Sequence, residues 1–226
     1  MRWEEWEPLY QSIIREFNYS RKEDERAAKI LNSLLANKRI CDDGCISRRI
    51  YKEVTVCGGA SNLKEHLDEF GIVGTSIAAD NATSVLLANG LLPDLIVTDL
   101  DGNVREQIMA NAEGTIAIVH AHGDNIPQLK EHVPHFNGLI SGTTQSREVG
   151  VIKNYGGFTD GDRAVSIARQ FGATKIRLLG FDFENPVTKL GKDLDTKKKK
   201  LIWAKRLIFE NGPKTTILWT PENDNC

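Results

Sequence analysis

The sequence predicts an α/β protein in which a mainly parallel sheet is flanked by helices, with a helical segment at the N-terminus. Short apolar segments rich in β-branched residues alternate along the middle of the chain with segments whose apolar residues recur at helical spacing. Nearly every apolar segment is followed at once by glycine or a polar side chain, as happens where strands of a parallel sheet end. The 226 residues, 40% of them hydrophobic, suffice for one domain with a substantial core.

The N-terminal segment is expected to be helical to about residue 40. The apolar residues of a first helix recur at Trp3, Trp6, Leu9, Tyr10, Ile13, Ile14 and Phe17. Ser20 and Glu23 have the form of a capping box and open a second helix with one apolar face. We expect a helical segment over residues 1–45 that covers an α/β catalytic domain over residues 46–226.

The rest of the chain alternates between strand and helix patterns. The expected strands are residues 54–57, 75–79, 95–98, 115–119, 138–141, 175–180 and 215–219. The expected helices are residues 61–70, 82–88, 162–171 and 201–209. This alternation is typical of βαβ units, whose strands are parallel.

Polar and glycine residues follow most of these strands, and parallel strands end at one edge of a sheet. The groups that this edge would gather are Gly58, Gly59, Asp80, Asn81, Asp99, Asp101, residues 120–124 and Asp182. The sequence therefore predicts an acidic, glycine-lined crevice along the carboxyl edge.

Asp99 and Asp101 end the apolar strand of residues 95–98 and precede Gly102. At spacing i, i+2 in extended chain both carboxylates point the same way. Two carboxylates about 4 Å apart repel by roughly 4 kcal/mol at an effective dielectric of 20, so separation, a shared proton or a cation must offset the repulsion. Mg²⁺ takes one or two carboxylates together with phosphate oxygens. A plain turn is the alternative, since Asp and Gly favour turns.

Asp160 and Asp162 form a second acidic pair, after the flexible Gly156 and Gly157. They suggest further ligands of a hard cation. The alternative is structural, because Thr159 and Asp162 fit a capping box at a helix start.

Three other groups are candidates for substrate contacts. Gly58 and Gly59 form a strand-to-helix turn whose free amides could hold phosphate, although ordinary turn chemistry explains them equally well. His122 and Asp124, next to His120, are expected to line a substrate ring rather than to bind a metal. Among the lysines of its basic stretch, Lys192 is the one expected to neutralise a triphosphate. The alternative is that these lysines form only a solvated, charged face.

Charge and composition exclude some function classes. The net charge of −2 argues against nucleic-acid binding. No apolar run approaches the roughly 20 residues that span a bilayer, and the N-terminus is too acidic for a signal peptide. A cytoplasmic protein with reduced thiols is expected, and Cys41 and Cys45 lack the second pair that a zinc site needs. A homodimer is compatible with the sequence, which does not fix the oligomeric state.

Three motifs carry a resemblance to a known family. Residues 80–82, 93–102 and 159–164 follow the order seen in thiamine pyrophosphokinase catalytic domains. The chain is more similar to the archaeal 6-hydroxymethyl-7,8-dihydropterin pyrophosphokinase family, which has a run like residues 156–164 and a segment like residues 180–183 before a lysine-rich helix. The resemblance covers about residues 50–220 and implies a thiamine pyrophosphokinase-like fold.

The resemblance implies Mg²⁺-dependent transfer of diphosphate from ATP to the hydroxymethyl group of the pterin, with release of AMP. It implies Asp99, Asp101 and Asp162 as Mg²⁺ ligands and Asp160 as a ligand or an orienting group. Asp80 and Asn81 would line the pocket, as would Thr159. The alternatives are a thiamine pyrophosphokinase, a metal-dependent glycosyltransferase using Asp99 and Asp101, and a nucleotide-binding module without catalysis.

Overall fold

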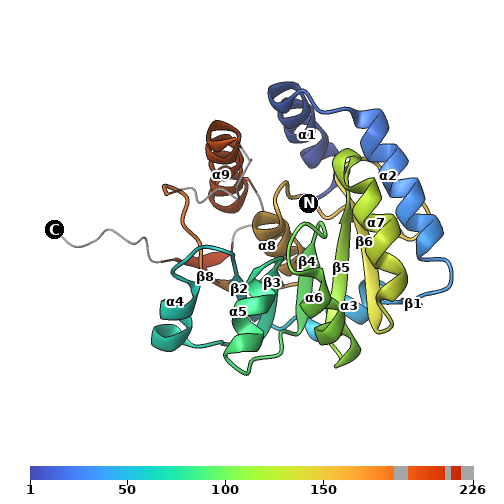
Figure 1. Cartoon of the computed structure of the whole chain (residues 1–226). Coiled ribbons are helices and arrows are strands. Elements are labelled where there is room, and N and C mark those ends of the chain that lie inside the picture. The colour runs from blue at the N-terminus through green and yellow to red at the C-terminus, as the bar shows by residue number, and fades with distance from the viewer. Residues whose placement is uncertain (186–192, 212–214, 220–226) are drawn as a thin grey trace.

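A computed structural model describes residues 1–185, 193–211 and 215–219 of the chain (Figure 1). The α-helices in these ranges are α1 (Trp3–Phe17), α2 (Arg21–Leu34), α3 (Asp43–Arg49), α4 (Leu63–Phe70), α5 (Ala82–Ala88), α6 (Val104–Ala112), α7 (Ile126–His132), α8 (Asp160–Gln170) and α9 (Leu194–Phe209). The strands are β1 (Arg39–Ile40), β2 (Glu53–Cys57), β3 (Thr75–Ala79), β4 (Leu95–Thr98), β5 (Ile116–Ala121), β6 (Leu139–Thr144), β7 (Ile152–Lys153), β8 (Lys175–Leu179) and β9 (Thr216–Leu218).

These strands form one sheet in the order β1-β6-β5-β4-β3-β2-β8-β9, with β7 paired to β6. Every strand pairing in the described ranges is parallel. The predicted α/β fold with a mainly parallel sheet is confirmed. Because β3, β4 and β5 are neighbours at the centre, the loops that follow them meet at the middle of the carboxyl edge.

The central strands are buried on both faces, which explains their continuous apolar sequences. Alternate residues enter different cores: Val97 packs in a cluster with residues of α8, whereas Ile96 packs in a cluster with residues of α4 and α5. A third cluster joins α2 and α7 to β5 and β6. Helices therefore cover both faces of the sheet, and only its edges are left for a ligand.

The N-terminal helices α1 and α2 occur as expected, and Ser20 accepts a hydrogen bond from the amide of Glu23. The prediction of helix up to residue 40 needs one correction, because Arg39 and Ile40 form β1 and pair with β6. A two-residue strand has no periodicity that a sequence could show. The domain boundary at residue 45 stays a prediction.

Helix α1 packs against α9, and the two lie together at the top of Figure 1. Buried Trp6 and Trp203 belong to one cluster, and the Trp203 indole donates a hydrogen bond to Glu16. Helix α9 begins at Leu194, well before the predicted start at residue 201, because Asp193 caps it by accepting from the amide and hydroxyl of Thr196.

The expectation of reduced thiols is wrong for one pair: Cys41, which follows β1, and Cys45, in the first turn of α3, form a disulfide. Cys57 is a free thiol, and burial raises its pKa to about 12. Within the described parts of the chain, none of the helices has the length and apolar character needed to cross a membrane.

Candidate active site

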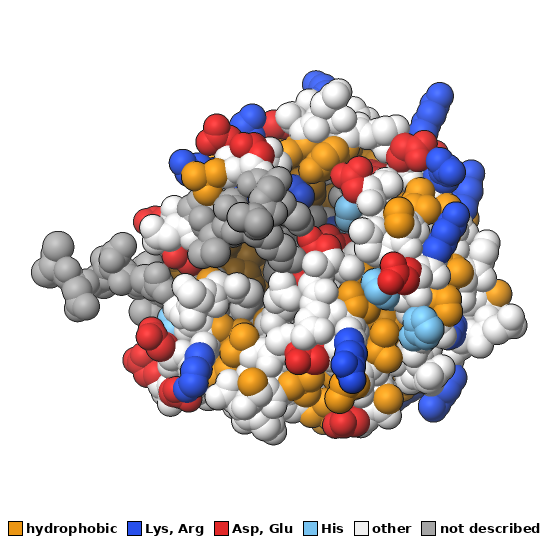
Figure 2. Space-filling model, viewed as in Figure 1, with side chains coloured by type: hydrophobic (Ala, Val, Ile, Leu, Met, Phe, Trp, Pro, Cys, Tyr) orange, Lys and Arg blue, Asp and Glu red, His pale blue; other side chains and the backbone are white. Residues whose placement is uncertain are grey.

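A cavity of about 620 Å³ opens at the carboxyl edge of the sheet. Figure 2 shows acidic side chains in the hollow near the centre of this face. The cavity is lined by the ends of β2 to β6 and β8, by the start of α8, and by α9. Most of the site residues expected from the sequence line it: Gly58, Gly59, Asp80, Asn81, Asp99, Asp101, His122, Asp124, Thr159 and Asp160.

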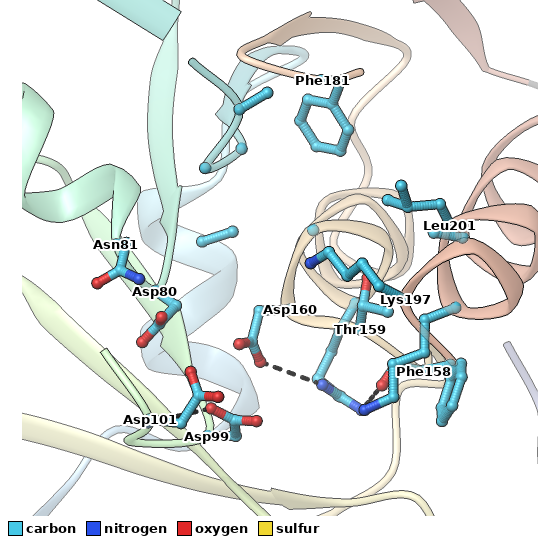
Figure 3. Close-up of a pocket in the computed structure, with 18 of the residues that line it drawn as sticks. Asp80, Asn81, Asp99, Asp101, Phe158, Thr159, Asp160, Phe181, Lys197 and Leu201 are labelled. Atoms are coloured by element: carbon cyan, nitrogen blue, oxygen red, sulfur yellow. Dashed lines mark hydrogen bonds and ion pairs between the residues drawn. The ribbon is translucent and has the colours of Figure 1, made fainter. Parts of the chain in front are cut away.

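Three carboxylates meet inside this cavity. One oxygen each of Asp80, Asp99 and Asp160 lies within 4.8 Å of the other two. Asp80 follows β3, Asp99 follows β4, and Asp160 is the first residue of α8. Figure 3 shows these carboxylates facing one another, with Asp101 beside Asp99. The sequence predicts Asp99, Asp101 and Asp162 as ligands and Asp160 as a ligand or an orienting group. The structure brings Asp99 and Asp160 together with Asp80.

The loops that carry Asp80 and Asp99 have left-handed backbone. The φ angle of Asp80 is 46° and that of Leu100 is 67°, values that cost free energy for residues other than glycine. Gly102 lies against the first of these loops: a Cβ atom there would stand 2.4 and 2.5 Å from the carboxylate oxygens of Asp80. Only glycine allows the two loops to approach this closely.

Hydrogen bonds fix the direction of the Asp80 carboxylate. Its Oδ1 accepts from Thr98 Oγ1 at 3.1 Å and from Gln107 Nε2 at 2.9 Å. Thr98 ends β4, and Gln107 is a fully buried residue of α6. Sequence reasoning missed Gln107, because a single glutamine in a helix gives no indication of the strand end it will reach.

The three carboxylates repel one another. Burial, followed by the charge of Asp99, raises the pKa of Asp160 well above its ordinary value, and Arg163 opposes this effect. A cation would relieve the repulsion. Carboxylate oxygens are hard ligands of the kind Mg²⁺ takes, so Asp80, Asp99 and Asp160 fit such an ion.

Arg163 is a buried cation beside the carboxylate cluster. Its side chain is 2% exposed and lies 3.4 Å from Asp160, and it donates to the carbonyls of Gly157 and Phe158. It also contacts His120 Nε2 at 3.0 Å. Because an arginine side chain can only donate, Nε2 of His120 must accept this hydrogen bond. The imidazole proton is therefore assigned to Nδ1, which contacts Thr143 Oγ1.

His120 is therefore a neutral, fully engaged side chain. Burial lowers its pKa well below the ordinary value, and the charge of Arg163 adds to the effect. The predicted strand of residues 115–119 extends as β5 to Ala121, which places His120 inside the sheet.

The position of Asp162 does not fit its expected role as a metal ligand. Its carboxylate accepts from the amides of Phe158 and Thr159 and from Thr159 Oγ1, completing the capping box of α8. Asp162 is 2% exposed and is not among the residues that line the cavity. Both oxygens are occupied, so Asp162 supports the loop while Asp160 faces the site.

His122 and Asp124 stand at the end of β5. His122 Nδ1 accepts from the amide of Asp124 at 3.3 Å, and its Nε2 lies 3.5 Å from Asp99 Oδ2. Buried Asn125 donates to the carbonyls of Asp99 and His120 and accepts from the amide of His122. Asn125, which sequence reasoning missed, thus ties the end of β4 to the end of β5.

The glycine turn after β2 contacts the loop after β8. A Cβ atom at Gly58 would stand 2.5 Å from the carbonyl oxygen of Gly180, whereas one at Gly59 would meet no atom within 4 Å. Gly59 therefore leaves its backbone open to a ligand.

Lysines from α9 reach the cavity from the opposite wall. Lys192 lies outside the described residues, so its expected role stays a prediction. Lys197 and Lys200 line the cavity, and Figure 3 shows Lys197 extending into it from α9. The i, i+3 spacing of these two lysines indicates a shared helix face. The prediction from the sequence does not use this signal, because it places the start of α9 only at residue 201.

The family described as 6-hydroxymethylpterin diphosphokinase MptE-like matches residues 30–188, a range that contains all three carboxylates of the cluster. The chain belongs to this family. The resemblance seen in the motifs is thereby confirmed. Tyr19 and α9, which also line the cavity, lie outside the matched range.

Three archaeal relatives extend the match over nearly the whole chain. A 6-hydroxymethyl-7,8-dihydropterin pyrophosphokinase of Pyrococcus furiosus is 41% identical over 230 residues, which cover 96% of this chain and 98% of the relative. The protein of the same name from Methanothermobacter thermautotrophicus is 39% identical and covers 90% of this chain and 92% of its own length. That from Methanocaldococcus jannaschii is 34% identical, with 92% and 95% covered.

Proposed function

We propose that this chain transfers diphosphate from ATP to the hydroxymethyl group of 6-hydroxymethyl-7,8-dihydropterin and releases AMP. The observation that carries the proposal is the meeting of Asp80, Asp99 and Asp160 within 4.8 Å in a cavity at the carboxyl edge. The names of the three relatives supply the acceptor.

In this proposal Asp80, Asp99 and Asp160 hold Mg²⁺, and Asp101 stands next to them as an additional ligand. The ion would gather negative charge from the phosphate oxygens as the bond to the β-phosphorus breaks. Asp162 is not proposed as a ligand, because its oxygens are used in the helix cap.

The other residues bind and position. Lys197 and Lys200 line the wall formed by α9, where they would neutralise the phosphates that the carboxylates alone would repel. The hydroxymethyl oxygen must lie in line with the β-phosphorus, and holding the two substrates in that geometry supplies much of the rate acceleration. The loops fixed by Thr98, Gln107 and Asn125 provide the rigid frame for this.

The test is AMP formation from ATP and Mg²⁺ with the dihydropterin as acceptor, with thiamine in a parallel reaction. We expect AMP with the pterin alone. Asp99→Asn should lower kcat by at least about a hundredfold and leave the thermal unfolding temperature of the apoprotein unchanged or higher. Asp68→Asn, on the exposed surface of α4, serves as the matched control with unchanged activity.

AMP formation only with thiamine would overturn the choice of acceptor. Full activity of Asp99→Asn would overturn the assignment of the carboxylate cluster as the metal site.

A further inference from the structure

Gln145 occupies a fixed position at the end of β6. It follows the last residue of the strand, lines the cavity, and is 4% exposed. Its main-chain carbonyl accepts a hydrogen bond of 2.8 Å from the indole of buried Trp6 in α1. Its side-chain Nε2 donates to Asp24 Oδ2 of α2, also at 2.8 Å.

Asp24 decides which way the amide of Gln145 faces. The buried carboxylate accepts from Tyr10 and from the amide of Gly123 as well as from Gln145. Because the carboxylate oxygens of Asp24 accept all three of these hydrogen bonds, the nitrogen of the Gln145 amide faces Asp24. The other polar atom of this amide, Oε1, has no hydrogen-bond partner among the described residues. These residues do not enclose it completely. Gln145 therefore offers an oriented acceptor to whatever fills the cavity.

The sheet order divides the cavity into two sides. Two carboxylates of the cluster, Asp80 and Asp99, follow β3 and β4. The ends of β5 and β6 lie on one side of these two strands, and those of β2 and β8 lie on the other. The β2–β8 side presents the open backbone of Gly59, at a strand-to-helix turn that suits phosphate. The β5–β6 side presents Gln145 and His122.

Two aromatic side chains also line the cavity. The ring centroids of Tyr19 and Phe158 are 6.4 Å apart, with the ring planes tilted by 51°. The amine of Lys200 lies 5.9 Å from the centroid of Tyr19 and 5.7 Å from that of Phe158. Both rings belong to the cluster built around Trp6 and Tyr10, which are the residues that contact Gln145 and Asp24. A planar ring with hydrogen-bond donors on its edge suits this combination of aromatic side chains and a fixed acceptor.

We propose that the acceptor substrate binds on the β5–β6 side, and that Gln145 Oε1 accepts from the amino-pyrimidinone edge of its ring. The inference rests on the proposed function and adds the residue that recognises the acceptor. Gln145 contacts the substrate, and Asp24 is a positioning residue that acts through it. The donor nucleotide then lies on the β2–β8 side, and the two substrates meet at the carboxylate cluster.

The experiment compares two acceptors in two variants. Gln145→Met keeps the volume and removes the amide, and Gln11→Met makes the same change at an exposed position of α1. The acceptors are the dihydropterin and its analogue with oxygen in place of the 2-amino group. Gln145→Met should raise the KM for the pterin roughly tenfold, leave the KM for ATP within about twofold, and reduce the preference for the pterin over the analogue. Gln11→Met should change none of these.

Two results would contradict these expectations, and they overturn different proposals. If the wild-type protein forms no AMP with the pterin, the proposed function fails. If it forms AMP but Gln145→Met keeps the wild-type KM and preference, or raises the KM for ATP instead, only the assignment of Gln145 is overturned.

A measurement without variants covers the case in which Gln145→Met does not fold. The wild-type protein should bind the dihydropterin roughly tenfold more tightly than the 2-oxo analogue, because the analogue presents an acceptor where Gln145 needs a donor. Equal binding of the two compounds would overturn the proposal.

Discussion

At the residue scale, the site depends on which carboxylates face the cavity. Asp160 and Asp162 are two positions apart at the start of α8, yet one lines the cavity and the other is enclosed by the cap of its own helix. Asp160 lies close to Asp99 and Asp80, and Arg163 lies 3.4 Å from it. This arrangement costs free energy in the absence of a cation, which is expected of a site built to hold one.

The charge on Asp160 should make the apoprotein less stable as pH rises. Burial and Asp99 raise its pKa in the folded state, so the folded state keeps a proton that the unfolded state releases above about pH 4. The contribution of Asp160 to the free energy of unfolding therefore decreases as pH rises from about 4 to the raised pKa. Asp160→Asn removes the effect, so in chelator it should unfold at a higher temperature than wild type at pH 7, with the gain vanishing near pH 4.

The control for this prediction is Asp124→Asn, which changes an exposed carboxylate of the same cavity. It should show no such pH-dependent gain. A lower unfolding temperature for Asp160→Asn at pH 7 would mean that its contact with Arg163 outweighs the repulsion.

At the element scale, strand ends and glycines shape the cavity. Most strands were predictable to within two residues, because each is a β-branched run bounded by glycine or polar residues. The two-residue strands β1 and β7 and the helices α3, α6 and α7 were not predicted. The two strands and α3 are too short to show a period. The start of α9 was missed because a lysine run resembles a solvated loop until its cap, Asp193, is recognised.

Gly102 tests how closely the loops after β3 and β4 must approach. Gly102→Ala places a Cβ atom 2.4 Å from an oxygen of Asp80 and 2.5 Å from Asn81 Oδ1, so the loop must shift. Activity should fall roughly a hundredfold, with a loss of about 1–3 kcal/mol in the free energy of unfolding. Steady-state kinetics and chemical denaturation measure the two effects.

Gly44→Ala is the matched control. Its added Cβ meets no atom closer than 3.5 Å, and it lies in α3 away from the cavity. It should stabilise the protein by about 0.5–1 kcal/mol and leave activity unchanged. Wild-type activity in Gly102→Ala would show that the loops tolerate separation.

At the scale of the whole molecule, the N-terminal helices belong to the site. Helix α1 contacts α9 through Trp203 and Glu16, and it contacts the end of β6 through Trp6 and Gln145. The helices that precede residue 45 therefore pack closely against elements that follow it.

Unfolding should accordingly be a single transition that includes α1. Trp6 is 1% exposed, so Trp6→Ala should lower the free energy of unfolding by about 3–5 kcal/mol. Ile202→Ala, at a side chain that is 64% exposed, should change it by less than about 0.5 kcal/mol. Scanning calorimetry that resolved two transitions, with only one shifted by Trp6→Ala, would show that α1 folds as a separate unit.

The sequence by itself determined the fold class, the parallel edge and the two acidic turns, because these depend on local patterns of apolar, glycine and acidic residues. Only the tertiary structure decided which carboxylates meet. Asp80 joins Asp99 because β3 and β4 are neighbours, and Asp162 turns away because Thr159 and Phe158 take up its oxygens. Strand order and cap geometry are long-range and orientational properties, and a spacing along the chain contains neither.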